Sequence, residues 1–287
     1  CIDNDEAKID QLSAGYIPIV EVGLDHLGHS GVGSGRLTFT SDTRSGIANA
    51  DFVFLCLPTP DRPDGTVEMR FVEEVASQIG PWLRPGAVIV NKSTVPVGTT
   101  RRVASLLGRS DVFVVSNPEF LREGNAVSDF LNPSRVVVGG DDSRAVEAVA
   151  DLYQGTGAPV VLCDATSAET IKYAANAFLA TKISFINSIA NICEHLGADV
   201  RVVADAIGRD PRIGNQFLQP GPGFGGSCFP KDLSAFIKIS DQLGYDFRLL
   251  KEVQRINAGQ MDRFFKKIQD TLWVLKEKKI GVLGLAF

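Results

Sequence analysis

The clearest chemical signal in this chain lies in the segment "PGPGFGGSCFPKDLSAF", Pro220 to Phe236. Its glycines and prolines let a backbone approach a ligand closely, and Pro230 suits the first turn of a following helix. Cys228 would then lie at a helix N-terminus, whose partial positive charge favours the thiolate, the nucleophilic form. Asp232, four residues on, could hold a water or a proton near the sulfur. The alternative is a buried, unreactive thiol, but the glycine-rich approach favours the nucleophile.

A second signal is a polar pair on an otherwise apolar helix. Lys172 and Asn176 are four residues apart in "KYAANAF", so both side chains would point the same way. This pattern indicates a polar pocket. A surface lysine whose stem lies along apolar neighbours is the alternative.

Three loops follow three predicted strands and combine prolines with hydroxyl or carboxylate side chains. They are "LPTP" at Leu57 to Pro60, "KSTVPVG" at Lys92 to Gly98 and "NPEFLREG" at Asn117 to Gly124. Glu119 and Glu123 would share a face if their segment turned helically. Ordinary turn chemistry explains any one loop, and a solvated carboxylate pair is the alternative for the glutamates. Three such loops at successive strand ends favour a ligand cleft.

The opening "CIDNDEAKI" has the form of a strand that ends in an acid and is followed by a helix. In dinucleotide-binding units, a carboxylate at the end of the second strand binds the adenosine ribose. Asp3 fits that role, and the glycine fingerprint would precede residue 1. The alternative is that Asp3 and Asp5 only cap the helix.

The elements that must position these residues follow an α/β pattern in the first half. Continuous β-branched runs predict buried parallel strands, with a shorter strand at Arg36 to Thr40, and amphipathic stretches between them predict helices. The strands are expected at Asp51 to Leu57, Ala87 to Asn91, Val112 to Val115 and Arg135 to Gly139, and the helices at Met69 to Gly80, Thr99 to Gly108 and Ser143 to Tyr153. This order predicts a doubly wound parallel sheet, in which ligands bind beyond the carboxyl ends of the strands.

Beyond Val160 to Cys163 the pattern becomes helical. The run Ser167 to Leu196 has a helical apolar period and is expected to form the spine of a second, all-helical domain and a face for self-association. Further helices are predicted at Val200 to Ile207, Lys231 to Leu243 and Arg248 to Lys276, and "KKIGVLGL" near the end predicts another strand. Both ends of the chain look cut, since it starts at Cys1 and stops within an apolar run.

Composition narrows the function classes. The 287 residues suggest about two domains, and a net charge of −5 leaves no basic excess for general nucleic-acid binding. No apolar run approaches the roughly 20 residues of a membrane span, and no signal-peptide pattern opens the chain, so we expect a cytoplasmic protein. The five cysteines are scattered without a C-x-x-C pair, which argues against disulfides and zinc. His26 and His29 are expected in a glycine-rich loop and His195 near a helix end, so no metal is assigned.

Together, "NPEFLREG", "IKYAANAF", "PRIGNQFLQPGPGFGGSCFPKD" and "IGVLGLAF" resemble the UDP-glucose/GDP-mannose dehydrogenase family over the whole chain. The resemblance implies a Rossmann-like NAD-binding domain at 1–158 without its first strand, a central helical dimerisation and catalytic domain at 159–276, and the first strand of a nucleotide-sugar-binding domain at 277–287. It implies oxidation of UDP-glucose to UDP-glucuronate with two NAD⁺, through a thiohemiacetal and a thioester. GDP-mannose or a UDP-N-acetylhexosamine is the alternative substrate. Because the glycine loop and the last domain are missing, we expect this chain alone to be inactive.

The resemblance also implies a role for individual residues. Cys228 matches the nucleophile, Lys172 the lysine that stabilises oxyanions or shuttles a proton, and Asn176 and Asp232 the groups that place substrate oxygen and water. The matching substrate contacts are Glu119, Phe120, Leu121, Lys172, Asn176, Phe224 and Gly225, with Arg212 reaching the site of the partner in a dimer. The matching cofactor contacts are Asp3, Lys8, Pro58, Thr59, Ser93, Thr94 and Glu123, of which Thr94 and Glu123 lie near the nicotinamide and the hydrolytic water.

Two other function classes compete with this assignment. A non-catalytic dimerising scaffold would keep only the long helix, and the intact Cys228, Lys172 and Asp232 argue against it. A β-hydroxyacid dehydrogenase also follows its Rossmann domain with a long helix, but such enzymes need a lysine and no thiol. Cys228 in its glycine loop argues against that class.

Overall fold

The computed structural model describes residues 1–284 and divides the chain into two compact units. The first unit comprises residues 1–59 and 67–172, and the second comprises residues 60–66 and the chain from 173 onward. The boundary at 172/173 falls inside one long helix, α8 (Ala165–Leu196). No helix among the described residues is long and apolar enough to cross a membrane.

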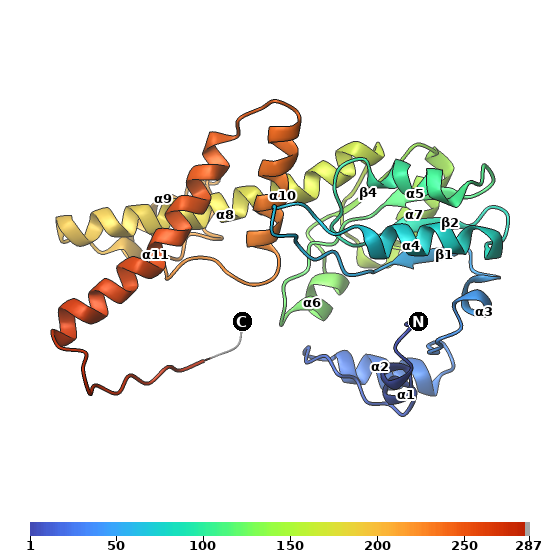
Figure 1. Ribbon diagram of the computed structural model, residues 1–287, viewed down its shortest axis with the longest axis horizontal. Helices are drawn as coiled ribbons and strands as arrows, with labels where there is room; N and C mark the ends of the chain where they lie inside the picture. Colours follow the sequence, from blue (N-terminus) through green and yellow to red (C-terminus); the bar gives the residue numbers. More distant parts are fainter. Residues whose placement is uncertain (285–287) are drawn as a thin grey trace. The chain divides into compact units, whose positions relative to one another are not determined.

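The first unit is built on a five-stranded sheet in the order β1-β2-β3-β4-β5 (Figure 1). Its strands are β1 (Phe52–Leu55), β2 (Val88–Asn91), β3 (Phe113–Ser116), β4 (Val136–Gly140) and β5 (Val160–Cys163). The first three strands run parallel, with Phe54 opposite Val90. Each predicted strand of the first half that follows residue 50 is therefore present, with β1 and β2 shorter than predicted and β3 and β4 shifted by one residue.

The sheet is mixed, because β4 runs antiparallel to β3, with Val115 opposite Gly140. The apolar run of β4 had predicted a parallel strand. A parallel neighbour needs a long crossover, usually a packed helix, whereas the segment between β3 and β4 holds only the six-residue α6 (Ala126–Leu131). Strand direction here follows the connection and not the composition of the strand.

Helices cover both faces of the sheet, as the doubly wound pattern predicts. Ile89 packs in one core cluster with residues of α4 (Arg70–Ile79) and α5 (Thr99–Leu107). Its neighbour Val90 points to the other face and packs with α7 (Ser143–Asp151). Both side chains are fully buried, and burying one such side chain contributes about 2 kcal/mol, so β2 is anchored from both faces.

The N-terminal part of the first unit departs from two expectations. The run Arg36 to Thr40 forms no β-strand; its only β-type pairing is an isolated parallel bridge between Ile2 and Thr40. His26 and His29 lie in a helix, α2 (Leu24–Gly33), and not in a loop. The flanking helices are α1 (Glu6–Ser13) and α3 (Thr43–Ile47).

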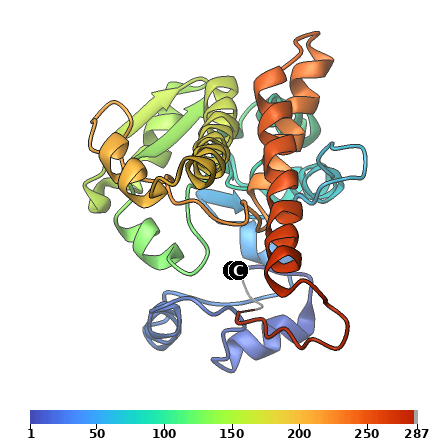
Figure 2. The same cartoon turned by 90° about the vertical axis from the view of Figure 1, so that its left-hand side faces the viewer.

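The second unit is helical over its described residues. After α8 it contains α9 (Val200–Gly208), α10 (Phe229–Gln242) and α11 (Arg248–Leu272), and α11 is continuous in both views (Figures 1 and 2). Two short 3₁₀ helices, Gly80–Trp82 and Gln154–Thr156, belong to the first unit. The strand expected near the end is absent over residues 278–284, and residues 285–287 of that prediction lie outside the described part.

Candidate active site

The three predicted ligand loops emerge at one edge of the sheet, because β1, β2 and β3 are parallel. Ser93 ties the first two together: its Oγ donates to the carbonyl of Leu57 at 2.7 Å. The backbone N–H of Asn117 donates to the carbonyl of Asn91 at 2.9 Å, which joins the third loop to the end of β2, directly before the second loop. The expected cluster of loops therefore exists within the first unit.

Lys172 reaches this edge from the first turns of α8. Its Nζ donates to Glu119 Oε1 at 2.9 Å and lies 5.5 Å from the centre of the Phe120 ring. The lysine side chain is 4% exposed and that of Glu119 25% exposed. A surface lysine, the alternative raised from the sequence, is thus wrong, because the carboxylate and the aromatic face let the ammonium remain buried. Glu119 also accepts a hydrogen bond from the Leu121 N–H at 2.6 Å.

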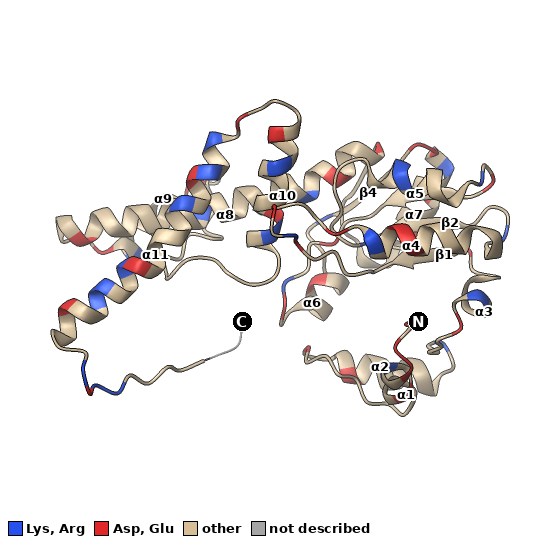
Figure 3. Ribbon diagram, in the orientation of Figure 1, with Lys and Arg blue, Asp and Glu red and all other residues tan. Residues whose placement is uncertain are grey.

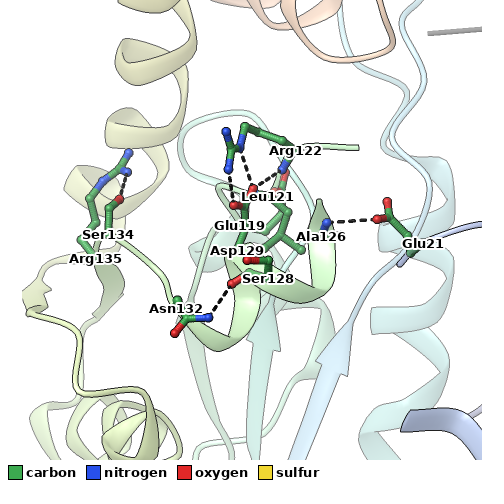
Figure 4. Close-up of polar contacts among 10 residues, drawn as sticks. All are labelled: Glu21, Glu119, Leu121, Arg122, Ala126, Ser128, Asp129, Asn132, Ser134 and Arg135. Carbon is green, nitrogen blue, oxygen red and sulfur yellow. Dashed lines mark hydrogen bonds and ion pairs between the residues drawn. The ribbon is translucent and has the colours of Figure 1, made fainter. Parts of the chain in front are cut away.

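The loop that carries Glu119 is not helical, so Glu119 and Glu123 do not share a helix face, and Glu123 is exposed. Figure 4 shows how the loop is held. Arg122 donates from its backbone and its guanidinium to Asp129, with Nη2 at 2.6 Å from Oδ1. Glu21 accepts from the Ala126 N–H at 3.1 Å, as the figure shows. It also accepts from the Gly124 N–H at 2.8 Å. These bonds brace the segment from both sides.

A polar cluster that the sequence had not singled out lies beside these loops. Lys92 Nζ donates to Asn117 Oδ1 at 3.0 Å and lies 3.4 Å from Tyr153 Oη, which itself donates to Asn117 Oδ1 at 2.5 Å. Burial lowers the pKa of Lys92 to about 8, against a raising effect of Glu119, and raises the pKa of Tyr153 to about 12. The loop edge therefore holds a lysine that is partly neutral near physiological pH.

The remaining cofactor candidates also belong to the first unit. Asp3 and Lys8 form an ion pair, and the hydrogen bond from Lys8 lowers the pKa of Asp3. Thr59 is buried, Thr94 is half-buried, and Pro58 is exposed. Hydroxyls at the carboxyl ends of parallel strands, with an ionised carboxylate able to bind ribose hydroxyls, fit a nicotinamide dinucleotide.

The thiol lies in the second unit, at the position that the glycine loop predicted. Cys228 is the N-cap residue of α10, and Pro230 lies in the first turn of the helix. The side chain is exposed, so the thiol is not buried as the alternative supposed. Ser227 Oγ lies 3.6 Å from Cys228 Sγ.

A buried amide–carboxylate pair lies one turn further along α10. Asn176 Nδ2 donates to Asp232 Oδ2 at 2.6 Å, and both residues are buried. Lys231 Nζ lies 3.9 Å from the other carboxylate oxygen. These two predicted site residues, 56 residues apart in sequence, are brought together by α8 and α10.

Two asparagines that sequence reasoning missed hold the glycine loop. Asn257 on α11 clamps the backbone of Phe224, accepting from its N–H at 2.7 Å and donating to its carbonyl at 3.0 Å. Asn187 on α8 accepts from the Gly221 N–H at 2.8 Å. At Gly223, with φ of +113°, a Cβ would lie 2.6 Å from Asn257 Oδ1, so this position requires glycine.

The other residues of this unit with expected roles are accessible. Gly225 is exposed and Phe224 half-buried, with the Phe224 ring packed edge-on against Phe229 at 5.9 Å. Arg212 is exposed and forms an ion pair with Asp210. The predicted site residues thus fall into two groups, one in each unit.

Comparison with known proteins identifies the family. The NAD binding domain of the UDP-glucose/GDP-mannose dehydrogenase family matches residues 1–156, and the central domain of that family matches residues 166–259. UDP-glucose 6-dehydrogenase TuaD of Bacillus subtilis is 48% identical over 100% of this chain, which spans 63% of that protein.

Solved structures agree with these matches. A UDP-glucose dehydrogenase from Pyrobaculum islandicum has a TM-score of 0.93 at 39% identity, covering 100% of this chain and 68% of its own. A GDP-mannose dehydrogenase from Pseudomonas aeruginosa has a TM-score of 0.71 at 33% identity, with coverage of 94% and 65%. The chain belongs to the UDP-glucose/GDP-mannose dehydrogenase family.

Proposed function

We propose that the protein is an NAD-dependent UDP-glucose 6-dehydrogenase that oxidises the C6 alcohol to a carboxylate through a covalent intermediate on Cys228. The observation that carries the proposal is the exposed thiol at the N-terminus of α10, preceded by a clamped glycine loop and followed by the Asn176–Asp232 pair. A structural cysteine would need none of these features. A thiol that forms and releases a thioester needs an approach for the substrate and a placed water.

The proposed reaction has two oxidations and one hydrolysis. The C6 alcohol loses a hydride and a proton to become an aldehyde, and the Cys228 thiolate adds to it to give a thiohemiacetal. Loss of a second hydride gives a thioester, and water then releases the carboxylate and regenerates the thiol. NAD⁺, when bound, accepts the hydride in each oxidation. The balance is one alcohol, one water and two NAD⁺ giving one carboxylate, two NADH and three protons.

Each polar group suits one step of this reaction. The buried ammonium of Lys172 can stabilise a developing alkoxide, because a positive charge in a low-dielectric site interacts strongly with an oxyanion. The Asp232 carboxylate, fixed by Asn176, can orient the hydrolytic water and take its proton. Thr94 and Glu123 are proposed to lie near the nicotinamide and that water.

For the cofactor, we assign Asp3 and Lys8 to the adenosine ribose and the residues of the loop edge to the rest. The ionised Asp3 supports this role, since a carboxylate accepts hydrogen bonds from ribose hydroxyls. The proposed lining of the cofactor site comprises Pro58, Thr59, Ser93, Thr94 and Glu123.

UDP-glucose is the proposed substrate, with GDP-mannose and a UDP-N-acetylhexosamine as the alternatives. The 48% identity to a protein named UDP-glucose 6-dehydrogenase, against 33% to a GDP-mannose dehydrogenase, supports this choice. We assign sugar contacts to Glu119, Phe120, Leu121, Phe224 and Gly225.

The test is NADH formation by the purified full-length protein with UDP-glucose, GDP-mannose and UDP-N-acetylmannosamine in parallel. We expect turnover with UDP-glucose and at least tenfold lower kcat/KM with the other two. Preference for another nucleotide sugar would correct the substrate, and no NADH with any of the three would refute the function.

We also propose a homodimer formed through α8. Phe178, Phe185 and Ile192 are spaced seven residues apart on this helix and are 65%, 51% and 53% exposed. Such a stripe on one helix face is the pattern of a helix–helix interface. We further propose that Arg212 reaches the substrate site of the partner.

Mixing two inactive variants tests the shared site. Arg212→Ala and Cys228→Ser homodimers should each be impaired, while hybrids should regain activity, because one of their two sites has both residues intact. A lack of recovery despite subunit exchange would refute the role of Arg212. A fully active monomer in sedimentation at micromolar concentration would refute the dimer itself.

A further inference from the structure

A buried carboxylate outside the proposed chemistry links α8 to the start of α5, where the Lys92–Gly98 loop ends. Glu169 on α8 is 3% exposed. Its Oε2 accepts from the Gly98 N–H at 2.6 Å, and its Oε1 accepts from the Thr100 N–H and the Thr100 Oγ1, both at 2.7 Å. All three donors lie at the start of α5.

We infer that Glu169 is a positioning residue that caps α5 from another helix and thereby fixes the Ser93–Thr94 loop and Lys172 in one arrangement. The inference rests on the proposed function, in which that loop contacts NAD⁺ and Lys172 stabilises oxyanions.

The need for a remote cap follows from the local sequence. The first N–H groups of a helix have no partner within the helix, and a Ser, Thr, Asp or Asn side chain at the N-cap usually supplies one. At α5 the N-cap is Gly98, with φ of +96° and no side chain to donate or accept. Glu169 therefore supplies the missing acceptor from 71 residues away in the chain.

The cap is connected to the proposed cofactor loop. Gly98 ends the segment that begins at Lys92 and contains Ser93 and Thr94. Its neighbour Thr99 turns back on this segment, donating from Oγ1 to the Pro96 carbonyl at 2.6 Å. Fixing the Gly98 N–H against Glu169 thus fixes the end of the loop.

The same carboxylate sets the rotation of α8. Glu169 and Lys172 are three residues apart on this helix, so they lie on the same face. The rotation that brings Glu169 to α5 also directs Lys172 to Glu119, at 2.9 Å. Loss of the Glu169 contacts would therefore loosen both the Ser93–Thr94 loop and the position of Lys172.

The three hydrogen bonds also stabilise the carboxylate form of Glu169, which burial disfavours. Burial is the main influence on Glu169 and raises its pKa, while the bonds from Thr100 and Gly98 oppose that rise. Because both oxygens accept hydrogen bonds, glutamine cannot replace the carboxylate, since its NH₂ group would face one of the donors.

The experiment compares Glu169→Gln with Asp142→Asn in the full-length protein. Asp142 is a matched control, because its side chain caps α7 by accepting from the Ala145 N–H at 3.0 Å and has no assigned role in the proposed site. The measurements are the thermal midpoint, amide hydrogen exchange at Gly98 and Thr100, the Kd for NAD⁺ by calorimetry, and kcat and KM in NADH formation.

Both variants should lower the thermal midpoint, as loss of a cap does. Only Glu169→Gln should speed exchange at Gly98 and Thr100 and weaken NAD⁺ binding by about tenfold, the effect of losing one well-made cap, with kcat also reduced. If Glu169→Gln fails to fold, Thr100→Val, which removes one of the three bonds, should show smaller shifts in the same directions.

Unchanged NAD⁺ affinity, KM and kcat in a destabilised Glu169→Gln protein would overturn the inference, because a purely structural cap gives that result. It would leave the proposed function intact. Wild-type protein that does not bind NAD⁺ at all would instead refute the proposed function, and the positioning role with it.

Discussion

The buried ion pair between Lys172 and Glu119 should respond unequally to removal of its two members. Glu119→Gln leaves an ammonium that is almost fully buried, whereas Lys172→Met leaves a carboxylate that is 25% exposed and can be rehydrated. The carboxylate also keeps its hydrogen bond from Leu121. In addition, Glu119 offsets repulsion between Lys172 and Lys92, whose charges interact. We therefore expect Glu119→Gln to be the more destabilising change.

The magnitudes follow from burial. Breaking a buried pair by removing one partner costs about 3–5 kcal/mol, and the partial exposure of Glu119 places Glu119→Gln near the lower value, about 3 kcal/mol. Lys172→Met keeps most of the buried aliphatic stem, so its cost should approach that of one hydrogen bond, about 1 kcal/mol. The double variant should be close to Lys172→Met, since no unpaired charge remains.

Urea unfolding at pH 7 measures these differences. Asp141→Asn is the control, because it neutralises the partner of Arg101 in an ion pair whose side chains are 62% and 65% exposed, where no measurable change is expected. Equal costs for Glu119→Gln and Lys172→Met, or a Glu119→Gln variant as stable as Asp141→Asn, would refute the reasoning.

Two further predictions concern groups that hold the loops. The pKa of Lys92 is about 8 in the folded state, against an ordinary value of 10.5. Between these two pH values the unfolded state therefore binds more protons than the folded state. The stability of wild type relative to Lys92→Met should thus rise by about 3 kcal/mol from pH 8 to 10.5. Unfolding titrations should show this rise, and a flat or falling difference would contradict it. Asn257→Asp replaces the donor to the Phe224 carbonyl with an oxygen, and should raise the KM for the nucleotide sugar about tenfold with the KM for NAD⁺ unchanged. Equal changes in both KM values would contradict a specific role in the glycine loop.

Much of the fold was predictable because its signals are local. Continuous β-branched runs identified β1 to β4, and the apolar period of α8 identified that helix almost to its ends. The helix α2 was missed because three glycines lower helix propensity by about 1 kcal/mol each. At one of them, Gly28, an added Cβ would lie 2.2 Å from the end of the Ile17 side chain, so a larger residue would have to displace that side chain. The helix forms here despite a composition that disfavours it.

The site residues likewise divide into those with a local sequence signal and those without one. Cys228 and Lys172 could be proposed from the sequence because each lies in a distinctive segment of a few residues. Glu169 and Asn257 were missed because their partners are 71 and 33 residues away, and a single polar residue on a helix resembles a solvated one. Figure 3 shows α11 with charges of both signs along its length, a surface on which Asn257 has no distinguishing signal.

The central claim, covalent catalysis by Cys228, is tested most directly by trapping the intermediate. Full-length protein would be mixed with UDP-glucose and NAD⁺, quenched in acid within the first turnover, and mapped by peptide mass spectrometry. We expect an acyl adduct of the UDP-glucuronyl mass on the Cys228 peptide, released by hydroxylamine, absent without NAD⁺, and accompanied in steady state by two NADH per UDP-glucose consumed. No adduct on Cys228, together with undiminished multiple turnover by Cys228→Ser, would contradict it.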